Sequence, residues 1–254
     1  MKTQVSIIMP SYNASAYLDQ ALQSVLGQTF QAWELLVVDD CSQDNSVALL
    51  QGYASQDSRI KVFPQKFNNG PATSRNIGIE EAQGRYITFL DSDDFWEPEF
   101  LASSLEFLEE RKIEFCFASY HRITEEGTYI DYFKVPQKVD YYSLLKTCPI
   151  PCLTAIYDTA RVGKHFMPPL KKRQDYGLWL SLAKEIDFMY GIQQPLATYR
   201  IRKNSVSRNK FKTAYYQWRI YREVEKLNIL KSLYYIIHYS INGILKYAVL
   251  LKTR

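Results

Sequence analysis

Three carboxylates come directly after an apolar, β-branched run at residues 86–90, and they are the residues of this chain best suited to chemistry. They are Asp91, Asp93 and Asp94, and the run before them reads Tyr-Ile-Thr-Phe-Leu. Such a run is typical of a strand that is covered on both faces. Side chains two apart in a strand point the same way, so Asp91 and Asp93 can present their carboxylates together.

Paired carboxylates favour a bound cation. At a separation of about 4 Å, two of them repel each other by roughly 1–4 kcal/mol at surface-like dielectric. A divalent ion reverses the sign of that energy, and Mg²⁺ typically takes one or two carboxylates together with substrate phosphates. The same Asp-Ser-Asp-Asp sequence also fits a solvated turn that caps the next helix, because Asp and Ser are common turn and cap residues.

The elements that must position these carboxylates alternate regularly over the first hundred residues. Strand-like apolar runs at residues 5–9, 35–38, 60–63 and 86–90 are each followed by a helical pattern. We expect the first helix to be capped by Ser15 and ended by Gly27, and the third to open at Pro71 and end near Gly84. The alternation predicts an α/β fold with a mostly parallel sheet and helices on both faces. The carboxyl ends of its strands, where the three Asp residues follow, are the edge that binds ligands.

The second half of the chain is less regular. It predicts helices at Pro98–Glu110 and Asp175–Lys184. The expected strands are Ile113–Tyr120, Tyr129–Val135, Leu153–Tyr157 and Leu196–Ile201. Beyond Lys210 the pattern becomes helical, aromatic and basic.

Charge divides the chain into an acidic body and a basic tail. The 254 residues carry a net charge of +4, yet residues 200–254 hold 13 Lys and Arg against 2 Asp and Glu, so the preceding residues are net acidic. The length fits one large domain, or a domain with an appendage, and 46% apolar residues support a substantial core. A basic tail of this kind is typical of a segment that meets an anionic surface or substrate.

The cysteines and the start of the chain indicate a cytoplasmic protein. Of the four cysteines, only Cys148 and Cys152 are close in sequence, and one Cys-x₃-Cys without a second pair is not typical of a zinc site. Free thiols fit a reducing compartment. The apolar run at residues 5–9 lacks the length and the cleavage site of a signal peptide.

Several classes of nucleotide enzyme are disfavoured. No Gly-x-Gly-x-x-Gly follows the first strand and no P-loop motif occurs, which argues against a dinucleotide dehydrogenase or a P-loop enzyme. Two alternatives stay open. A nucleotidyltransferase also uses carboxylates on an α/β sheet, but usually begins with a Gly-rich basic loop that Pro10–Ala14 lacks. The other alternative is a nucleotide-sugar-binding protein without catalysis, which would need no general base.

Four blocks in a fixed order resemble one known family. They are VSIIMPSYN at 5–13, ELLVVDDCSQDN at 34–45, GPATSRNIG at 70–78 and YITFLDSDD at 86–94. Together they resemble the nucleotide-binding half of family 2 glycosyltransferases, inverting enzymes of the GT-A fold, and the resemblance covers roughly residues 4–205. It implies a Rossmann-like catalytic domain at 1–210, with a nucleotide-binding half at 1–97 and an acceptor half at 98–210. Residues 211–254 are expected to form an amphipathic helical tail.

The resemblance also assigns roles to residues at the strand ends. It implies a nucleobase pocket lined by Pro10 and Tyr12, a uracil imide bound by Asp40, a base or diphosphate contact from Arg75, a ribose contact from Asp91 and a divalent metal, Mn²⁺ or Mg²⁺, held by Asp93. The chemistry is consistent, because an aromatic face suits a base and a cation neutralises a leaving diphosphate. Structural alternatives also stand: Tyr12 covering a strand end, Asp40 capping a helix, and Arg75 pairing with a carboxylate.

A second site is expected around Arg173-Gln174-Asp175. Family members often carry Glu-Asp here; this chain has Gln174 in place of the Glu and keeps Asp175. Inversion by direct displacement needs one base to deprotonate the acceptor hydroxyl, and Asp175 is the predicted base. Its alternative role is that of a helix N-cap. The Lys171–Arg173 run is either a solvated face or an attractor for a phosphorylated acceptor.

The segment Tyr199–Ser207 resembles the family's closing loop, commonly Tyr-Arg-x-His, which would cover the diphosphate. Arg202 stands in place of the His. Arg cannot ligate a metal as a neutral His does, so water or phosphate would fill that position. The three histidines of the chain lack metal-ligand spacing and receive no catalytic role.

The tail from Ile229 to Leu251 has the pattern of an amphipathic helix. Its expected polar stripe is Lys231, Tyr235, His238, Asn242 and Lys246. Its expected apolar face is Ile229, Leu233, Ile236, Ile237, Ile244, Leu245 and Val249. A charge at the centre of a membrane span costs about 2.5–3.5 kcal/mol, so an interfacial helix fits better than a span. Packing against the catalytic domain or a second subunit is the alternative.

These observations predict an inverting, metal-dependent hexosyltransferase. We expect it to move a sugar from a nucleotide-sugar donor, with UDP as the nucleotide, to a hydroxyl of a glycan or lipid-linked acceptor in bacterial surface-polysaccharide synthesis. We expect an anionic membrane surface as a partner through residues 212–254, at the inner face of the cell membrane, and no nucleic-acid partner.

Overall fold

The first half of the chain alternates strands and helices as the sequence predicts. The elements are β1 (Val5–Ser11), α1 (Ser15–Leu26), β2 (Trp33–Asp39), α2 (Ser46–Gln56), β3 (Ile60–Pro64), α3 (Pro71–Glu81) and β4 (Tyr86–Phe89). β1 pairs with β2 and β4, and β2 pairs with β3, all in parallel. The computed structural model describes residues 3–202 and 210–252.

The second half extends this sheet with mixed pairing. Its elements are β5 (Phe95–Trp96), α4 (Phe100–Arg111), β6 (Phe115–Thr124), β7 (Tyr129–Phe133), β8 (Lys138–Val139), α5 (Tyr141–Lys146), a 3₁₀ turn (Cys152–Thr154), β9 (Ile156–Asp158), α6 (Thr159–Val162), α7 (Gln174–Leu182) and β10 (Met189–Ile201). β10 runs parallel to β6, whereas β5, β7, β8 and β9 pair antiparallel with their neighbours.

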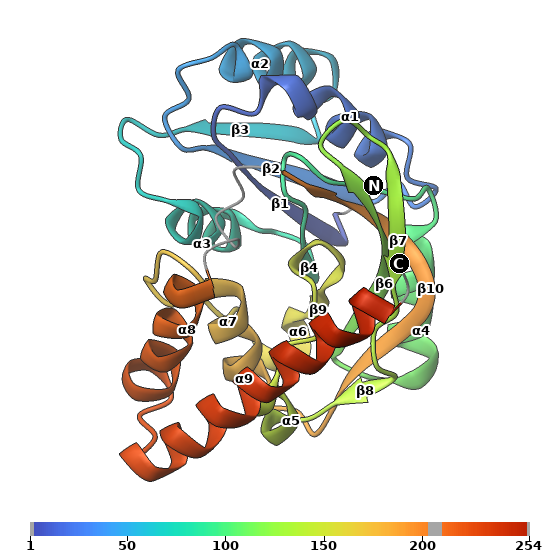
Figure 1. The fold of residues 1–254 in the computed structure, drawn as a ribbon. Helices are drawn as coiled ribbons and strands as arrows, with labels where there is room; N and C mark the ends of the chain where they lie inside the picture. The colour runs from blue at the N-terminus through green and yellow to red at the C-terminus, as the bar shows by residue number, and fades with distance from the viewer. Residues whose placement is uncertain (1–2, 203–209, 253–254) are drawn as a thin grey trace.

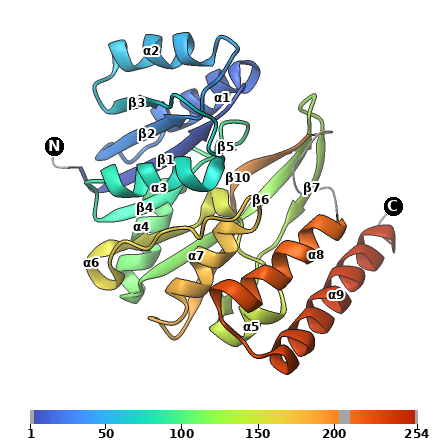
Figure 2. The same ribbon diagram turned by 90° about the vertical axis from the view of Figure 1, so that its left-hand side faces the viewer.

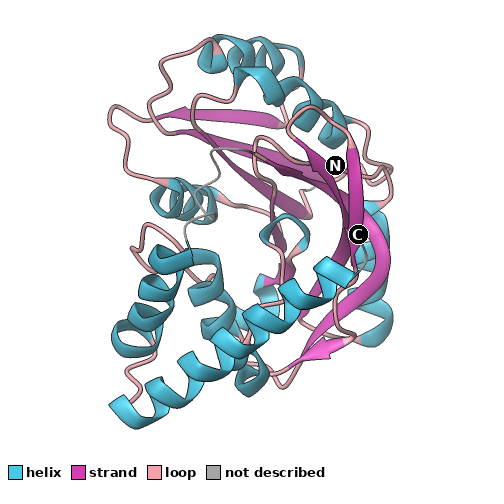
Figure 3. Cartoon of the chain, viewed as in Figure 1, coloured by secondary structure: helices cyan, strands magenta, loops and turns pink. Residues whose placement is uncertain are grey.

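Within the described residues these strands form one ten-stranded sheet, ordered β3-β2-β1-β4-β9-β6-β10-β5 with β7 and β8 attached to β6 and β10 (Figures 1 and 3). Both faces are covered. Ile7 of β1 packs in one core cluster with the helices α1 and α4, and Ile8 packs in the other with α3 and α7 (Figure 2). Alternate strand residues point to opposite faces, so the predicted α/β sheet with helices on both faces is confirmed.

Two helices complete the chain at the end of the molecule away from α2 (Figures 1 and 2). They are α8 (Lys210–Arg219), which continues into a π-helical turn at Ile220–Val224, and α9 (Ile229–Lys252). Ile220 and Tyr221 are fully buried, and the Tyr221 hydroxyl donates to the Leu145 carbonyl. The start of the tail is therefore part of the core. The expected domain boundaries at residues 97 and 210 stay a prediction.

The expected cap of α1 is wrong. Ala14, not Ser15, occupies the cap position, and no side chain of its own caps the helix. Instead the Ala14 amide donates to Ser46 Oγ at 2.9 Å and the Ser15 amide donates to Asp44 Oδ2 at 3.0 Å. The loop after β2 thus satisfies the helix start that Ser15 was expected to satisfy.

The expected strand Leu153–Tyr157 is also partly wrong, because Cys152–Thr154 is a 3₁₀ turn and β9 begins at Ile156. Thr154 Oγ1 accepts the Ala118 amide at 3.0 Å and donates to the Ala118 carbonyl at 2.9 Å. A side chain here replaces the ladder bonds that a strand would make. The sequence also missed β5, β8, α5 and α6, which are all short.

Candidate active site

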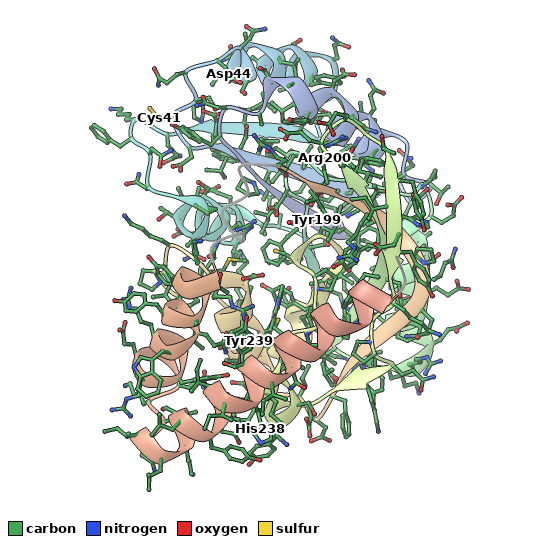
Figure 4. The ribbon with its side chains drawn as sticks, viewed as in Figure 1. Cys41, Asp44, Tyr199, Arg200, His238 and Tyr239 are labelled. Atoms are coloured by element: carbon green, nitrogen blue, oxygen red, sulfur yellow. The ribbon has the colours of Figure 1, made fainter. Side chains whose placement is uncertain are left out.

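A cleft of about 630 Å³ opens at the carboxyl edge of β1, β2 and β4, facing α7 and the end of β10. Its lining includes every residue for which the sequence predicts a role: Pro10, Tyr12, Asp40, Arg75, Asp91, Asp93 and Asp175. Figure 4 shows Tyr199 and Arg200, which also line it, at the carboxyl end of β10, and Tyr239 on α9. The geometry brings the two predicted sites together, although their roles remain predictions.

Asp40 shapes the end of the cleft at which the sequence predicts nucleotide binding. This carboxylate is 4% exposed, and its two oxygens accept the backbone amides of Asn69 and Gly70 at 2.8 Å each. Gly70 has φ +86°, a conformation that suits glycine and turns the chain into α3. Each carboxylate oxygen keeps a further lone pair for a ligand. Tyr12 stands at the rim, about half exposed, where its ring is open to a base.

Arg75 and Asp91 form an ion pair at the centre of the cleft. Arg75 is 6% exposed, and its Nε has no hydrogen-bond partner among the described residues. Burial alone would lower the pKa of Arg75, but the charge of Asp91, followed by smaller contributions from Cys152 and Asp175, raises it above its ordinary value. Arg75 therefore pairs with a carboxylate, as the structural alternative for this residue predicted. Its guanidinium contacts Asp91, the residue expected to bind the ribose.

Asp94 is buried and has a positioning role. Its Oδ1 accepts the Arg200 backbone amide at 2.8 Å, and its Oδ2 is buried without a partner among the described residues. Burial, then the charges of Asp93 and Asp91, raise the pKa of Asp94 well above its ordinary value. The Arg200 guanidinium donates to the Asp93 carbonyl at 3.1 Å. Arg200 and Asp94 together fix the turn that carries Asp93.

Asp93 has the surroundings that a bound cation would stabilise. Burial, then the neighbouring charge of Asp91, raise its pKa, and Arg202 opposes this with Nη1 at 3.3 Å from Oδ2. No group of three or more His, Cys, Asp or Glu gathers in metal-ligand geometry in the part of the chain that the structure describes. One protein carboxylate with diphosphate oxygens is a normal ligand set for Mg²⁺. The residues therefore fit a metal that binds together with the donor.

Asp175 lies in the first turn of α7, on the opposite wall. Its carboxylate is half-buried and makes no hydrogen bond to a described residue. The residue at the cap position is Arg173, so the N-cap alternative for Asp175 is wrong. A carboxylate in the first turn is favoured by the helix dipole. It is thus available to a ligand in the cleft.

Sequence reasoning missed several cleft residues. The sequence places Arg200 only in the closing loop and gives no sign that Cys152 belongs to the site, yet both line the cleft. The Lys171–Arg173 run, for which the sequence allows either a solvated face or an acceptor contact, also lines the cleft. Residues 203–207 of the expected closing loop lie outside the described residues.

The comparison with known proteins decides the family. Residues 6–157 match the family model for glycosyl transferase family 2. The chain belongs to this family. It is 42% identical over 246 residues to the Bacillus subtilis protein named "Putative teichuronic acid biosynthesis glycosyltransferase TuaG", covering 96% of this chain and 98% of that one. It is 38% identical to the Escherichia coli enzyme WfgD, a UDP-Glc:alpha-D-GlcNAc-diphosphoundecaprenol beta-1,3-glucosyltransferase, over 96% and 95% of the two chains.

Solved structures show the same fold. Staphylococcus aureus TarS 1–349 in complex with UDP-GlcNAc aligns with a TM-score of 0.72 at 21% identity, over 93% of this chain and 71% of that one. The mannosyltransferase PcManGT from Pyrobaculum calidifontis, with GDP-Man and Mn²⁺, aligns with a TM-score of 0.66 at 15% identity, over 93% and 70%. The expected GT-A fold and glycosyltransferase class of this family 2 enzyme are confirmed. Neither the nucleotidyltransferase nor the non-catalytic alternative is favoured.

Proposed function

We propose that this glycosyltransferase moves a hexosyl group from a UDP-sugar to a hydroxyl of a lipid-linked glycan, with inversion, during bacterial surface-polysaccharide synthesis. The observation that carries the proposal is the single cleft in which the carboxylates after β4 face Asp175 on α7. The relatives support the substrate class, because WfgD uses UDP-Glc and a diphosphoundecaprenol-linked acceptor, and TuaG is named for teichuronic acid biosynthesis. A carboxylate at Asp40 matches the imide N–H of uracil.

The proposed mechanism is one displacement. The acceptor oxygen attacks C1 of the donor sugar while Asp175 takes the hydroxyl proton. The bond from C1 to the diphosphate oxygen breaks on the opposite side, so UDP leaves and the configuration inverts. A divalent cation at Asp93, when bound, would neutralise the charge on the leaving diphosphate. Arg75 and Arg202 lie beside these carboxylates and add positive charge to the same end of the cleft.

A nucleotide-sugar panel tests the proposal. We expect UDP-hexoses with Mn²⁺ to raise the melting temperature and to be hydrolysed slowly, because a ligand that binds only the folded state stabilises it. GDP-sugars should do neither, since guanine presents a different edge to Asp40. Stabilisation by GDP-mannose alone would refute UDP as the nucleotide. Absence of any nucleotide-sugar binding would refute the proposed function.

The structure corrects the expected faces of α9. Tyr235 and Asn242, expected in an exposed polar stripe, face the body: the Tyr235 ring lies 6.0 Å from that of Tyr221, and Asn242 donates to the Lys146 carbonyl at 3.3 Å. Ile236, expected with the apolar face, is also partly buried against the core. The exposed side is apolar, with Ile229, Leu230, Leu233, Tyr234, Ile237 and Ile241. The side chains expected at Ile244, Leu245, Lys246 and Val249 lie outside those that the structure describes.

We propose that this exposed apolar face of α9 lies on the anionic inner surface of the cell membrane. Within the described residues, no helix is both long and apolar enough to cross a bilayer. The face has the spacing of an amphipathic helix, and Lys231 on α9 is exposed. The excess of 13 basic over 2 acidic residues beyond residue 199 adds an attraction of about 1 kcal/mol for each basic residue near the surface. An interfacial helix is stabilised both by burial of its apolar face and by attraction of its basic residues to anionic lipids.

Replacing Leu230, Leu233 and Ile237 together by serine should release the protein from anionic vesicles. Each methylene removed from the apolar interface loses about 0.8 kcal/mol, so partitioning should fall at least about tenfold. Vesicle flotation at low salt measures it. Deleting residues 212–254 is a poorer test, because it also removes the buried Ile220 and Tyr221.

Phe67→Ser is the matched control for this triple variant, because Phe67 is exposed and lies outside α9. It should float as the wild type does. Equal flotation of the triple variant and the wild type would contradict the membrane proposal. Loss of a dimer in the triple variant without any vesicle binding by the wild type would assign the face to a second subunit.

A further inference from the structure

Arg173 is a partly buried cation that forms no ion pair with a described carboxylate. Its Nε and Nη2 are buried and make no hydrogen bond to a described residue. Its guanidinium instead lies over two rings, 5.4 Å from the centroid of Tyr176 and 4.8 Å from that of Tyr239 on α9. Figure 4 shows Tyr239 on the side of α9 that faces α7. A partly buried charge in this state is costly unless a ligand completes it.

The backbone at Arg173 is held in an unusual conformation. With φ 64° and ψ 19° it is left-handed, which is uncommon for a side chain of this size. Strain of this kind persists where the surroundings impose it and gathers at binding sites. Here it places the guanidinium in the cleft lining, two residues before the proposed base.

Gln174, the next residue, adds a second polar group without a partner, and this one is a hydrogen-bond acceptor. Gln174 is 8% exposed and lines the cleft, and its Oε1 has no donor among the described residues. A carbonyl oxygen of this kind accepts a sugar hydroxyl. Arg173 offers donors to an anion, Gln174 offers an acceptor to a hydroxyl, and Asp175 offers a base. Three consecutive residues therefore present complementary groups to one sugar that carries a phosphate.

Two other cations of the cleft, at the proposed donor end, already pair with carboxylates. Arg75 pairs with Asp91, and Arg202 pairs with Asp93. Arg173 lies at the α9 side, and Lys171 is exposed at the same stretch of the cleft. A phosphate oxygen that enters between Arg173 and Tyr239 would replace a cation–π contact with charge-assisted hydrogen bonds, which are stronger.

We propose that Arg173 and Gln174 form an acceptor subsite for a sugar linked to a phosphate or diphosphate, in which Arg173 binds the phosphate and Gln174 Oε1 accepts a hydroxyl of the acceptor sugar. The inference rests on the proposed function and names the part of the acceptor that this chain recognises. The phosphate then lies beside α9, the helix that carries the exposed apolar face. A lipid attached to that phosphate has a short path to the membrane surface.

The test compares two synthetic acceptors with the same sugar, an alkyl-diphospho-α-GlcNAc and a neutral octyl α-GlcNAc. Arg173→Asn keeps a residue that tolerates the left-handed conformation but removes the cation. The ratio of kcat/KM for the diphosphate acceptor to that for the neutral one should fall about 10- to 100-fold, the range expected for hydrogen bonds to a charged group. Arg173→Lys, which keeps the charge without the planar fork, should recover part of the ratio.

Lys112→Asn is the matched control, because Lys112 is a left-handed cation outside the cleft, and it should leave the ratio unchanged. An unchanged ratio in Arg173→Asn, with both rates lowered equally, would overturn the subsite and leave a structural role. Calorimetry of the diphosphate acceptor without donor decides the subsite independently of turnover. Wild-type binding that Arg173→Asn loses supports the subsite even if no donor is used, whereas equal binding by both overturns it.

Discussion

Asp175→Asn should slow single-turnover transfer by about 10²–10⁴-fold, the usual contribution of a positioned general base. Asparagine keeps the size of the side chain but cannot accept a proton at neutral pH. Asp175 makes no hydrogen bond to a described residue, so the substitution breaks none there. Donor affinity should change little, because the proposed nucleotide contacts lie at the ends of β1, β2 and β4. Rapid-quench transfer and UDP titration on one preparation measure both quantities.

The cap position of α7 helps to interpret the rate of the Asp175→Asn variant. Since Arg173 holds the cap position of α7, a loss of stability through a missing cap is not expected. Asp175→Glu, which keeps the carboxylate but displaces it, should retain more activity than the asparagine variant. A fall in UDP affinity parallel to the rate would place Asp175 in the donor site, close to Arg75, whose pKa its charge helps to raise. A rate within about threefold of wild type would remove Asp175 from the mechanism, since a general base contributes far more.

Asp93→Ala should abolish the part of UDP binding that depends on Mn²⁺. Losing a proposed direct ligand should weaken the metal by at least the roughly 10- to 100-fold known for outer-shell partners. The fold should survive, because burial and the charge of Asp91 already disfavour the ionised form of Asp93, as its raised pKa shows. Removing it relieves repulsion, so the metal-free protein should melt no lower than the wild type. Calorimetry of UDP with and without Mn²⁺ measures the effect.

Asp131→Ala serves as the control, because Asp131 pairs with Arg122 outside the cleft. It should keep the metal dependence of UDP binding. Unchanged metal-dependent affinity in Asp93→Ala would refute the metal assignment. In that case a residue other than Asp93 would hold the metal.

Local pattern and the parallel-edge rule predict that the residues after β1, β2 and β4 lie close together, and the family resemblance supplies the donor-binding roles proposed for them. Pro10, Asp40 and Asp91 each lie at or just after a strand end, and neighbouring parallel strands bring such positions together. Asp175 required the family resemblance, because nothing in its local sequence separates a base from a helix cap. For the strand-end residues and for Asp175 alike, the sequence features that predict the position lie within a few residues of it.

The rest of the site depends on contacts between distant parts of the chain. Arg200 binds the Asp93 carbonyl, and Asp94 binds the Arg200 amide, more than a hundred residues apart. The left-handed conformation of Arg173 and the burial of Gln174 also follow from packing that no local pattern encodes. The helical periodicity of α9 was predictable from the sequence. Which side of α9 packs against the body was not, because it depends on the contacts of Tyr235 with Tyr221 and of Asn242 with Lys146.

The hydrogen bonds that replace the expected Ser15 cap belong to a larger connection between two loops. The Asn13 amide donates to Ser42 Oγ at 2.9 Å, the Gln43 amide donates to Asn13 Oδ1 at 2.8 Å, and the Asp40 amide donates to the Ser11 carbonyl at 2.8 Å. The loops after β1 and β2 are thus joined before any ligand arrives, so the nucleotide meets walls that need little ordering. The proposed acceptor subsite rests on α7 and its neighbour α9 instead. Under these proposed roles, acceptor preference can diverge in evolution by changes around α7 and α9 while the proposed nucleotide pocket is inherited intact.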